Sequence, residues 1–436
     1  MTQDAHRAIE AVWRIESARL IAGLTRFTHD VGAAEELAQE ALLAALEQWP
    51  AGGVPDNPGA WLTSVAKRRA IDLWRREERI APKHAEIGRE LDARQERAVA
   101  DLDAALDDPV GDDLLGLIFM TCHPVLSTEA RVALTLRLVG GLTTPEIARA
   151  FLVPEPTLAQ RIVRAKRTLT AAHVPFELPP RSELPARLAS VLEVIYLIFN
   201  EGYAATAGDE WMRPALCEDA LRLGRILAEL APAEPEVHGL VALMEVQASR
   251  AGARTGPAGE PIRLLEQDRA RWDFVLVNRG FAALARAEGL GGALGPYALQ
   301  AAIAACHARA RTSEETDWAR IAALYDALAQ LTPSPIVELN HAVAVGIAFG
   351  PAAGLEIIDR LISEPVLQVY HLLPAVRGDL LEKIGRLSEA RAEFERAAAL
   401  TQNGRERILL LSRAATCEES SPPPPLHIME RGESPP

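Results

Sequence analysis

Two clusters of cationic side chains are the residues best suited to chemistry in this sequence, and the chemistry is binding of a polyanion. Segment 142–169, LTTPEIARAFLVPEPTLAQRIVRAKRTL, has no acidic residue after Glu155 and ends in four cations. Segment 57–76, NPGAWLTSVAKRRAIDLWRR, carries five cations, one acid and two tryptophans. Guanidinium and ammonium groups neutralise phosphates, and aromatic rings stack with unpaired bases. Taken alone, each cluster also fits an ordinary solvated helix face.

The charge of the whole chain makes these clusters stand out. The formal net charge is −14 over 436 residues. Residues 113–172 nevertheless carry seven basic against four acidic side chains. Salt screens charges beyond about 8 Å at physiological ionic strength, so distant acids do not cancel a local basic face. Contact with nucleic acid would therefore have to come from these short segments.

The second half of segment 142–169 has the pattern of an amphipathic helix. Leu158, Ile162, Ala165 and Leu169 recur at spacings of four, three and four residues, which places them on one buried face. The polar residues left outward or flanking are Thr157, Gln160, Arg161, Arg164, Lys166 and Arg167.

The residues before this helix predict two more helices. Ser127 is placed to cap a helix that ends at the glycines 140–141, and Thr143 with Glu146 forms a capping box for the next helix. A short turn, LVPEP, follows. Helix, short turn and a second helix with a cationic outer face is the helix-turn-helix arrangement, whose second helix enters the major groove.

Segment 57–76 also predicts a basic helix. Asn57 is a capping residue, and Pro58 suits the first turn. Apolar residues at 61, 62, 65 and 66 give one face, whereas cations and Trp74 occupy the remainder. Such a surface fits a DNA backbone and unstacked bases.

Both segments resemble a known family. AAEELAQEALLAALEQW followed by AWLTSVAKRRAIDLWRR resembles region 2 of the extracytoplasmic-function (ECF) sigma factors of the sigma-70 family, and 142–169 resembles their region 4. RLASVLEVIYLIFNEGYAAT, LLEQDRARWD, LQAAIAACHARA and TDWARIAALYDAL resemble the extension of the ECF group that carries a fused tetratricopeptide-like domain. The resemblance therefore covers nearly the whole chain.

The resemblance implies partners and roles by position. Core RNA polymerase would be bound through its β′ clamp helices and β flap, with the clamp helices contacting Glu36, Gln39 and Glu40. The −35 promoter element would be read by Thr157, Gln160, Arg161, Arg164, Lys166 and Arg167. The −10 element, including a flipped base at the loop GGVPDNPG, would be bound by Asp56, Asn57, Trp61, Lys67, Arg68, Arg69, Trp74, Arg75 and Arg76.

The expected fold is all-α, with two small helical sigma domains and a C-terminal tetratricopeptide-like α-solenoid. The expected segments are region 2 at 1–78, an acidic linker at 79–112, region 4 at 113–172, the regulatory solenoid at 181–415 and a disordered tail at 416–436. Gly378, Gly385, Ala390, Phe394 and Ala397 have the spacing of a tetratricopeptide helix pair. An irregular helical bundle is the alternative. A solenoid would offer a concave surface to a protein or peptide partner.

Enzymatic chemistry is not expected, and neither is a metal site or a cofactor. The four cysteines lie far apart without a CxxC pair, which fits a reducing compartment. No stretch is long and apolar enough to span a bilayer, so we expect a cytoplasmic protein without membrane contact. A polar cluster, Glu266, Asp268, Arg269, Arg271, Trp272 and Asp273, is interpreted as salt bridges or a partner contact. His307 and His341 are interpreted as structural.

Two other classes of function compete with a sigma factor. A one-component activator would bind DNA through 142–169 and sense a ligand through the repeats. Such an activator needs neither a polymerase-docking helix nor a second DNA surface upstream, so the region 2 segment argues against it. A helical hydrolase or transferase would need a nucleotide loop, metal cluster or nucleophile motif, and none is recognisable.

Overall fold

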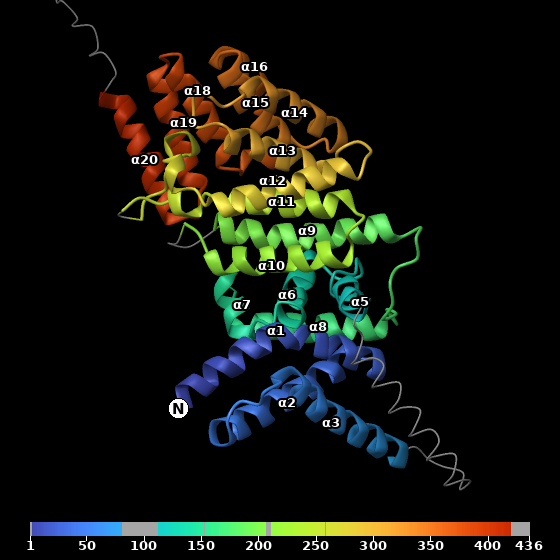
Figure 1. Ribbon diagram of the computed structural model, residues 1–436. Coiled ribbons are helices and arrows are strands. Elements are labelled where there is room, and N and C mark those ends of the chain that lie inside the picture. The colour runs from blue at the N-terminus through green and yellow to red at the C-terminus, as the bar shows by residue number, and fades with distance from the viewer. Residues whose placement is uncertain (1, 81–111, 152, 206–210, 258, 420–436) are drawn as a thin grey trace, which may run out of the picture. The chain divides into compact units, whose positions relative to one another are not determined.

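The computed structural model describes residues 2–80, 112–151, 153–205, 211–257 and 259–419. Over these residues the chain is all-α, as expected, and an isolated β-bridge joins Thr255 to Pro261. The chain divides into two compact units. Figure 1 labels the helices that belong to them. Unit 1 holds residues 1–204, 212–248 and 279–293, and unit 2 holds 205–211, 249–278 and 294–436.

The N-terminal helices of unit 1 are α1 (Thr2–Thr28), α2 (Val31–Gly52) and α3 (Pro58–Ile80). Asp30 begins α2 because its carboxylate accepts from the backbone N–H groups of Gly32 and Ala33. Asn57 caps α3 as predicted, accepting from Ala60 N at 3.1 Å. The three helices pack on one another, and buried small residues on α2 let them approach closely: Ala34, Ala38, Ala41 and Ala45.

The next four helices are α5 (Asp112–Thr121), α6 (Thr128–Leu138), α7 (Thr144–Ala150) and α8 (Glu155–Ala171). The predicted caps are confirmed. Ser127 accepts from Ala130 N, and Thr143 and Glu146 bond reciprocally at the start of α7. The predicted apolar stripe of α8 is buried throughout. Residues 144–171 thus form the expected helix-turn-helix.

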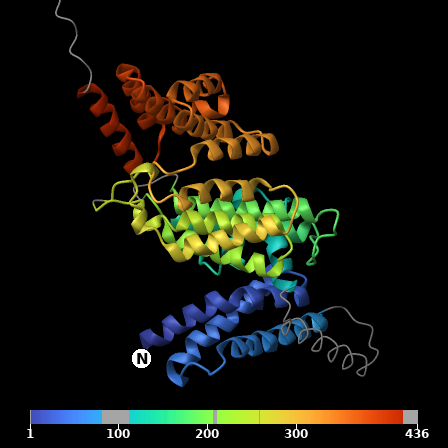
Figure 2. The ribbon, with the colours of Figure 1, turned by 45° about the horizontal axis from the view of Figure 1, so that its top comes forward.

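Unit 1 continues with α9 (Leu184–Tyr203), α10 (Pro214–Leu230), α11 (Pro235–Ala248) and most of α12 (Phe274–Gly289). Helices α9, α10 and α11 pack side by side (Figure 2). The second face of α9 packs on α5 and α6. Because α9 has neighbours on two sides, apolar residues occupy much of its circumference, including Val191, Leu192, Ile195 and Phe199.

Unit 2 consists of helical hairpins and a loop with three short 3₁₀ turns. The helices are α13 (Pro296–Arg309), α14 (Trp318–Leu331), α15 (Pro335–Ala348), α16 (Pro351–Leu361), α17 (Pro365–Gln368), α18 (Leu372–Lys383), α19 (Leu387–Leu400) and α20 (Gly404–Glu419). The turns are η1 (Ala251–Ala253), η2 (Leu264–Glu266) and η3 (Arg269–Arg271). Helices α13 to α15 each pack on the next helix in the chain, and so do helices α18 and α19. Helix α16 also packs on α18, past the short α17.

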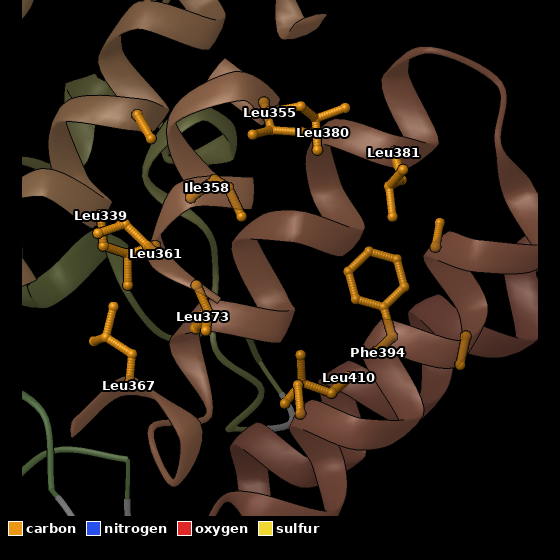
Figure 3. Packing of buried hydrophobic residues seen from close by; sticks show 14 of the residues in the cluster. Leu339, Leu355, Ile358, Leu361, Leu367, Leu373, Leu380, Leu381, Phe394 and Leu410 are labelled. Atoms are coloured by element: carbon orange, nitrogen blue, oxygen red, sulfur yellow. The ribbon is translucent and has the colours of Figure 1, made fainter. Parts of the chain in front are cut away.

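The pair α18 and α19 has the predicted tetratricopeptide-like features. Gly385 makes the turn between them at a φ of 79°, a left-handed conformation that favours glycine. A Cβ on Gly378 would lie 2.7 Å from the ring of Phe394, so the glycine allows the two helices to meet. Phe394 is fully buried in an apolar cluster with Leu380, Leu381 and Leu410 (Figure 3).

The compact units do not follow the segments expected from the sequence. Helices α9 to α11 belong to the same unit as the helix-turn-helix, although the sequence placed the solenoid boundary at 181. Helix α20 extends to Glu419, four residues into the predicted tail, because Cys417 is buried and anchors its last turn. The rest of that tail and linker residues 81–111 lie outside the described residues.

Candidate nucleic-acid interface

The outer face of α8 combines hydroxyl, amide and guanidinium groups. Thr157, Gln160 and Arg164 are exposed, and Arg161 is half-buried. They border a hollow of about 340 Å³ between this face and the start of α6. Its polar lining consists of Ser127, Thr157, Gln160, Arg161, Arg164 and Thr168. Amide and guanidinium groups pair with base edges, and guanidinium and hydroxyl groups bind phosphate, so this face can do both.

The start of α6 fixes the other side of this hollow. Ser127 caps α6 and also donates to Glu129 at 2.9 Å. The pKa of the Glu129 carboxyl is lowered, mainly by the backbone N–H of Glu129 itself, then by Ser127, with a smaller contribution from Arg161. Glu129 is therefore an anion at neutral pH, which attracts Arg161 toward α6 and leaves Arg164 as the more exposed cation.

Lys166, one of the residues expected to lie outward or flanking, lies against α2 and is largely buried. Its ammonium forms an ion pair with Glu35 of α2, a carboxylate that is only 5% exposed. Glu35 also accepts from Arg137 Nε of α6 at 2.7 Å and from Gln39 Nε2 at 2.6 Å. A buried carboxylate needs such partners, because an unpaired charge in the interior is costly. The ammonium of Lys166 is thus bound to Glu35 within unit 1, whereas Arg167 is exposed as predicted.

Glu35 is a residue that the sequence interpretation missed. The sequence interpretation assigned roles to Glu36, Gln39 and Glu40 and none to Glu35, which is one of the buried residues of α2. A signal was present, because Glu35 lies four residues after Val31 and three before Ala38, both of which are buried. A charged residue in register with an apolar stripe predicts a buried ion pair.

The second cationic face lies on α3. Arg68 and Arg69 are exposed there, and Lys67 is half-buried. Asp56 and Asn57 lie exposed in the loop before the helix. Trp61 is half-buried with its ring edge-on to the buried Trp49, at 5.4 Å between centroids, so it also belongs to the core of the three-helix segment. The side chains of Trp74, Arg75 and Arg76 lie outside the described residues.

The predicted polymerase-docking residues share α2 with Glu35. Glu36 and Glu40 are exposed, whereas Gln39 is half-buried and bonded to Glu35. Glu40 forms an ion pair with Arg69 of α3 at 3.5 Å, and both side chains are about half exposed. Exposed pairs of this kind contribute only about 0–1 kcal/mol, so a partner could displace either residue at little cost.

The polar cluster of unit 2 holds loops and helix ends together. Asp268 and Asp273 cap η3 and α12 by accepting from backbone N–H groups. Arg269 donates to Ala310 O at 2.8 Å, to Thr316 Oγ1 at 2.9 Å and to His307 O, so it closes the end of α13. These contacts are structural, and Glu266 likewise forms an ion pair with Arg263.

His307, whose carbonyl accepts from Arg269 of this cluster, makes unit 2 sensitive to acid. Burial, with the nearby Arg250 and Arg269, lowers the pKa of His307 from 6.5 to about 3. The unfolded chain therefore binds the proton first, and stability falls as the pH drops from about 6.5 toward 3.

We predict that the urea concentration at the unfolding midpoint of unit 2 decreases when the pH is lowered from 7 to 5, a range in which most carboxylates stay charged. His307→Gln should flatten this dependence, and an unchanged slope in the variant would contradict the prediction.

Comparison with protein families identifies both cationic segments. Residues 15–80 match sigma-70 region 2, and residues 116–169 match sigma-70 region 4. Residues 187–288 match DUF6596, a family of unknown function. The three matches follow one another along the chain, and they include α3, α8 and the helices that cover α5 and α6.

Full-length comparison finds relatives of two kinds. Uncharacterized protein R00370 of Rhizobium meliloti (strain 1021) is 44% identical over 88% of this chain and 89% of its own length. A protein of Mycobacterium tuberculosis (strain H37Rv), named probable ECF RNA polymerase sigma factor SigI, is 27% identical over 40% of this chain and 59% of its own length. No solved structure matches the chain.

The two sigma-70 regions on an all-α scaffold define a sigma-70-type transcription initiation factor, a class of non-catalytic proteins that act with RNA polymerase on promoter DNA. The chain belongs to the ECF sigma factors of the sigma-70 family and carries a DUF6596 domain in its C-terminal extension. Among the described residues, no helix is long and apolar enough to cross a membrane.

Proposed function

We propose that this sigma factor directs core RNA polymerase to its promoters by reading the −35 element with α8 and the −10 element with α3 and the loop before it, under control of its own C-terminal extension. The proposal rests above all on one observation. Two exposed cationic helices lie in one anionic chain, each inside a segment that matches a different sigma-70 region.

At the −35 element, α8 would enter the major groove. Thr157, Gln160, Arg161 and Arg164 line one hollow face and would meet base edges, and the exposed Arg167 would bind phosphate. A bidentate contact between a side chain and a base contributes about 1–3 kcal/mol of discrimination. Lys166 would join these contacts only after its ion pair with Glu35 opens.

At the −10 element, the cations of α3 would hold the displaced single strand. Asp56 and Asn57 lie exposed in the loop before α3, where a flipped base could be bound. Flipping costs a few kcal/mol of lost stacking and pairing. Arg68 and Arg69 would offset this cost through the backbone phosphates. Trp74, Arg75 and Arg76 would bind the same element, as the resemblance implies.

Polymerase would dock on α2 and on region 4. Glu36, Gln39 and Glu40 would bind the β′ clamp helices, and region 4 would bind the β flap. Docking would displace Arg69 from Glu40 and Gln39 from Glu35. We place the protein in the cytoplasm because its proposed partners, core polymerase and promoter DNA, are found there. No catalytic role, cofactor or metal belongs to this proposal.

The extension would act in two ways. Its helices α9 and α10 contact region 4 directly, for example through the hydrogen bond that Ser190 Oγ donates to Cys122 O at 2.8 Å. Through these contacts they would change the conformation of region 4. Its hairpins in unit 2 would bind a protein or peptide partner that sets when the factor is active.

The docking step can be tested by gel filtration with purified core polymerase. Wild-type protein should co-elute with core enzyme, whereas the double variant Glu36→Lys/Glu40→Lys should not, because cations replace the anions of the docking face. Glu47→Lys on the same helix, also exposed, serves as the matched control and should co-elute. Wild-type protein that fails to co-elute but binds promoter DNA alone would instead indicate a one-component activator.

A further inference from the structure

Two arginines of the extension reach the backbone on either side of α7, the first helix of the helix-turn-helix: one bonds the turn that precedes it and the other its last residue. Arg222 on α10 donates to Gly140 O at 2.7 Å, in the turn that leads into α7. Arg213, directly before α10, donates to Ala150 O at 2.5 Å, at the last residue of α7. Both arginines lie within the DUF6596 segment, and both carbonyls lie within region 4.

We infer that Arg213 and Arg222 are positioning residues of the −35 reader, so that the extension forms part of the DNA-binding module. This inference rests on the proposed function of α8. It specifies how the extension acts, which is by holding the backbone on both sides of α7 in the geometry that DNA binding requires.

Helix α7 needs such support because it is short. It has seven residues, too few for a helix that is stable in isolation. Its start is satisfied within region 4, where Thr143 and Glu146 bond reciprocally. Among its last carbonyls, Ile147 O and Ala148 O accept from backbone N–H groups that follow the helix. The last carbonyls together form the negative end of the helix dipole. A guanidinium at Ala150 O satisfies one of them and complements that dipole.

The guanidinium of Arg213 is itself held in place. It forms an ion pair with Glu201 near the end of α9, and the Arg213 side chain is 10% exposed. The Arg213 guanidinium therefore connects the carboxylate of Glu201 on α9 to the carbonyl of Ala150 at the end of α7. The turn between α7 and α8 begins directly after Ala150. A shift there would change the angle at which α8 meets DNA.

The test compares Arg213→Met and Arg222→Met in the full-length protein. Arg181→Met is the matched control, since Arg181 is exposed just before α9 and loses the same charge. Hydrogen exchange of the free protein is the first readout, because it needs neither DNA nor polymerase. Exchange at 140–153 should accelerate in both variants, whereas α9 and α10 should keep wild-type protection. Equal acceleration along α9 and α10 would overturn the inference, because the arginines would then stabilise the whole unit.

DNA binding is the second readout, with a promoter duplex that wild-type holoenzyme selects from a random-sequence library. Each variant should bind this duplex about tenfold more weakly, as expected for the loss of a charged hydrogen bond, with core polymerase binding unchanged. Arg222→Lys keeps a donor and should recover most of the affinity. Wild-type affinity together with wild-type exchange in both variants would overturn the inference. If wild-type holoenzyme selects no duplex, the proposed function fails, and the exchange result still decides the positioning role.

Discussion

A chain that ends after Pro180 is expected to lose the fold of region 4 and, with it, all promoter-dependent transcription. The reason is that α9 covers α5 and α6. Arg187 donates to Phe119 O at 2.8 Å, Ser190 donates to Cys122 O, and Phe119 is buried. Each large apolar side chain that is uncovered costs about 1.5–3 kcal/mol. Uncovering three would cost about 5–9 kcal/mol, which is comparable with the total stability of about 5–15 kcal/mol of a typical domain.

A chain that ends after Ala293 is the matched comparison for this truncation. It keeps every segment of unit 1, and we expect it to unfold cooperatively on heating. Circular dichroism melting and the soluble yield of both chains check the prediction. A chain ending at 180 that melts cooperatively and supports promoter-selective transcription would contradict it.

Replacing both arginines in the hollow of α8 is expected to have the second large effect. Arg161→Ala and Arg164→Ala should each weaken binding of the −35 duplex by about 1–3 kcal/mol if the side chain contacts a base. A contact to phosphate would instead lower the slope of log affinity against log salt by about one. The double variant should therefore lose about 100-fold or more in affinity, since 1.4 kcal/mol corresponds to a factor of ten.

Two further variants separate the roles of the cationic residues. Lys166→Ala should weaken duplex binding less than Arg164→Ala, because Lys166 must first leave Glu35. Arg75→Ala should leave duplex binding intact and reduce opening at −10, which permanganate footprinting measures. If all these variants bind the duplex and open the −10 element as well as wild type does, the site residues are misassigned.

The local features of the helices could be predicted because they depend on neighbours in sequence. Ser127, Thr143 and Asn57 cap helices as their residue types require, and the 4-3-4 stripe of α8 is buried. Gly385 makes its predicted turn for the same reason. Such signals span a few residues, and the backbone geometry that they favour is the one observed.

The partners of these elements could not be predicted, because a pattern indicates a buried face without saying what covers it. Lys166 has the spacing of an outward cation, but tertiary packing brings it to Glu35, 131 residues earlier in the sequence. Proline residues around 175–180 indicated a domain boundary, and the chain is indeed irregular there, yet α9 returns to pack on α5. A break in secondary structure is therefore a poor guide to the limits of a compact unit.

The central claim is that this protein gives core RNA polymerase its choice of promoter. Run-off transcription with purified core polymerase, over a library of genomic fragments, tests it most directly. We predict discrete transcripts that begin at a few sites and form only when this protein is present. The same transcripts should be absent when the double variant Arg161→Ala/Arg164→Ala replaces the wild-type protein. Initiation that is no more selective with the protein than with core polymerase alone would contradict the account.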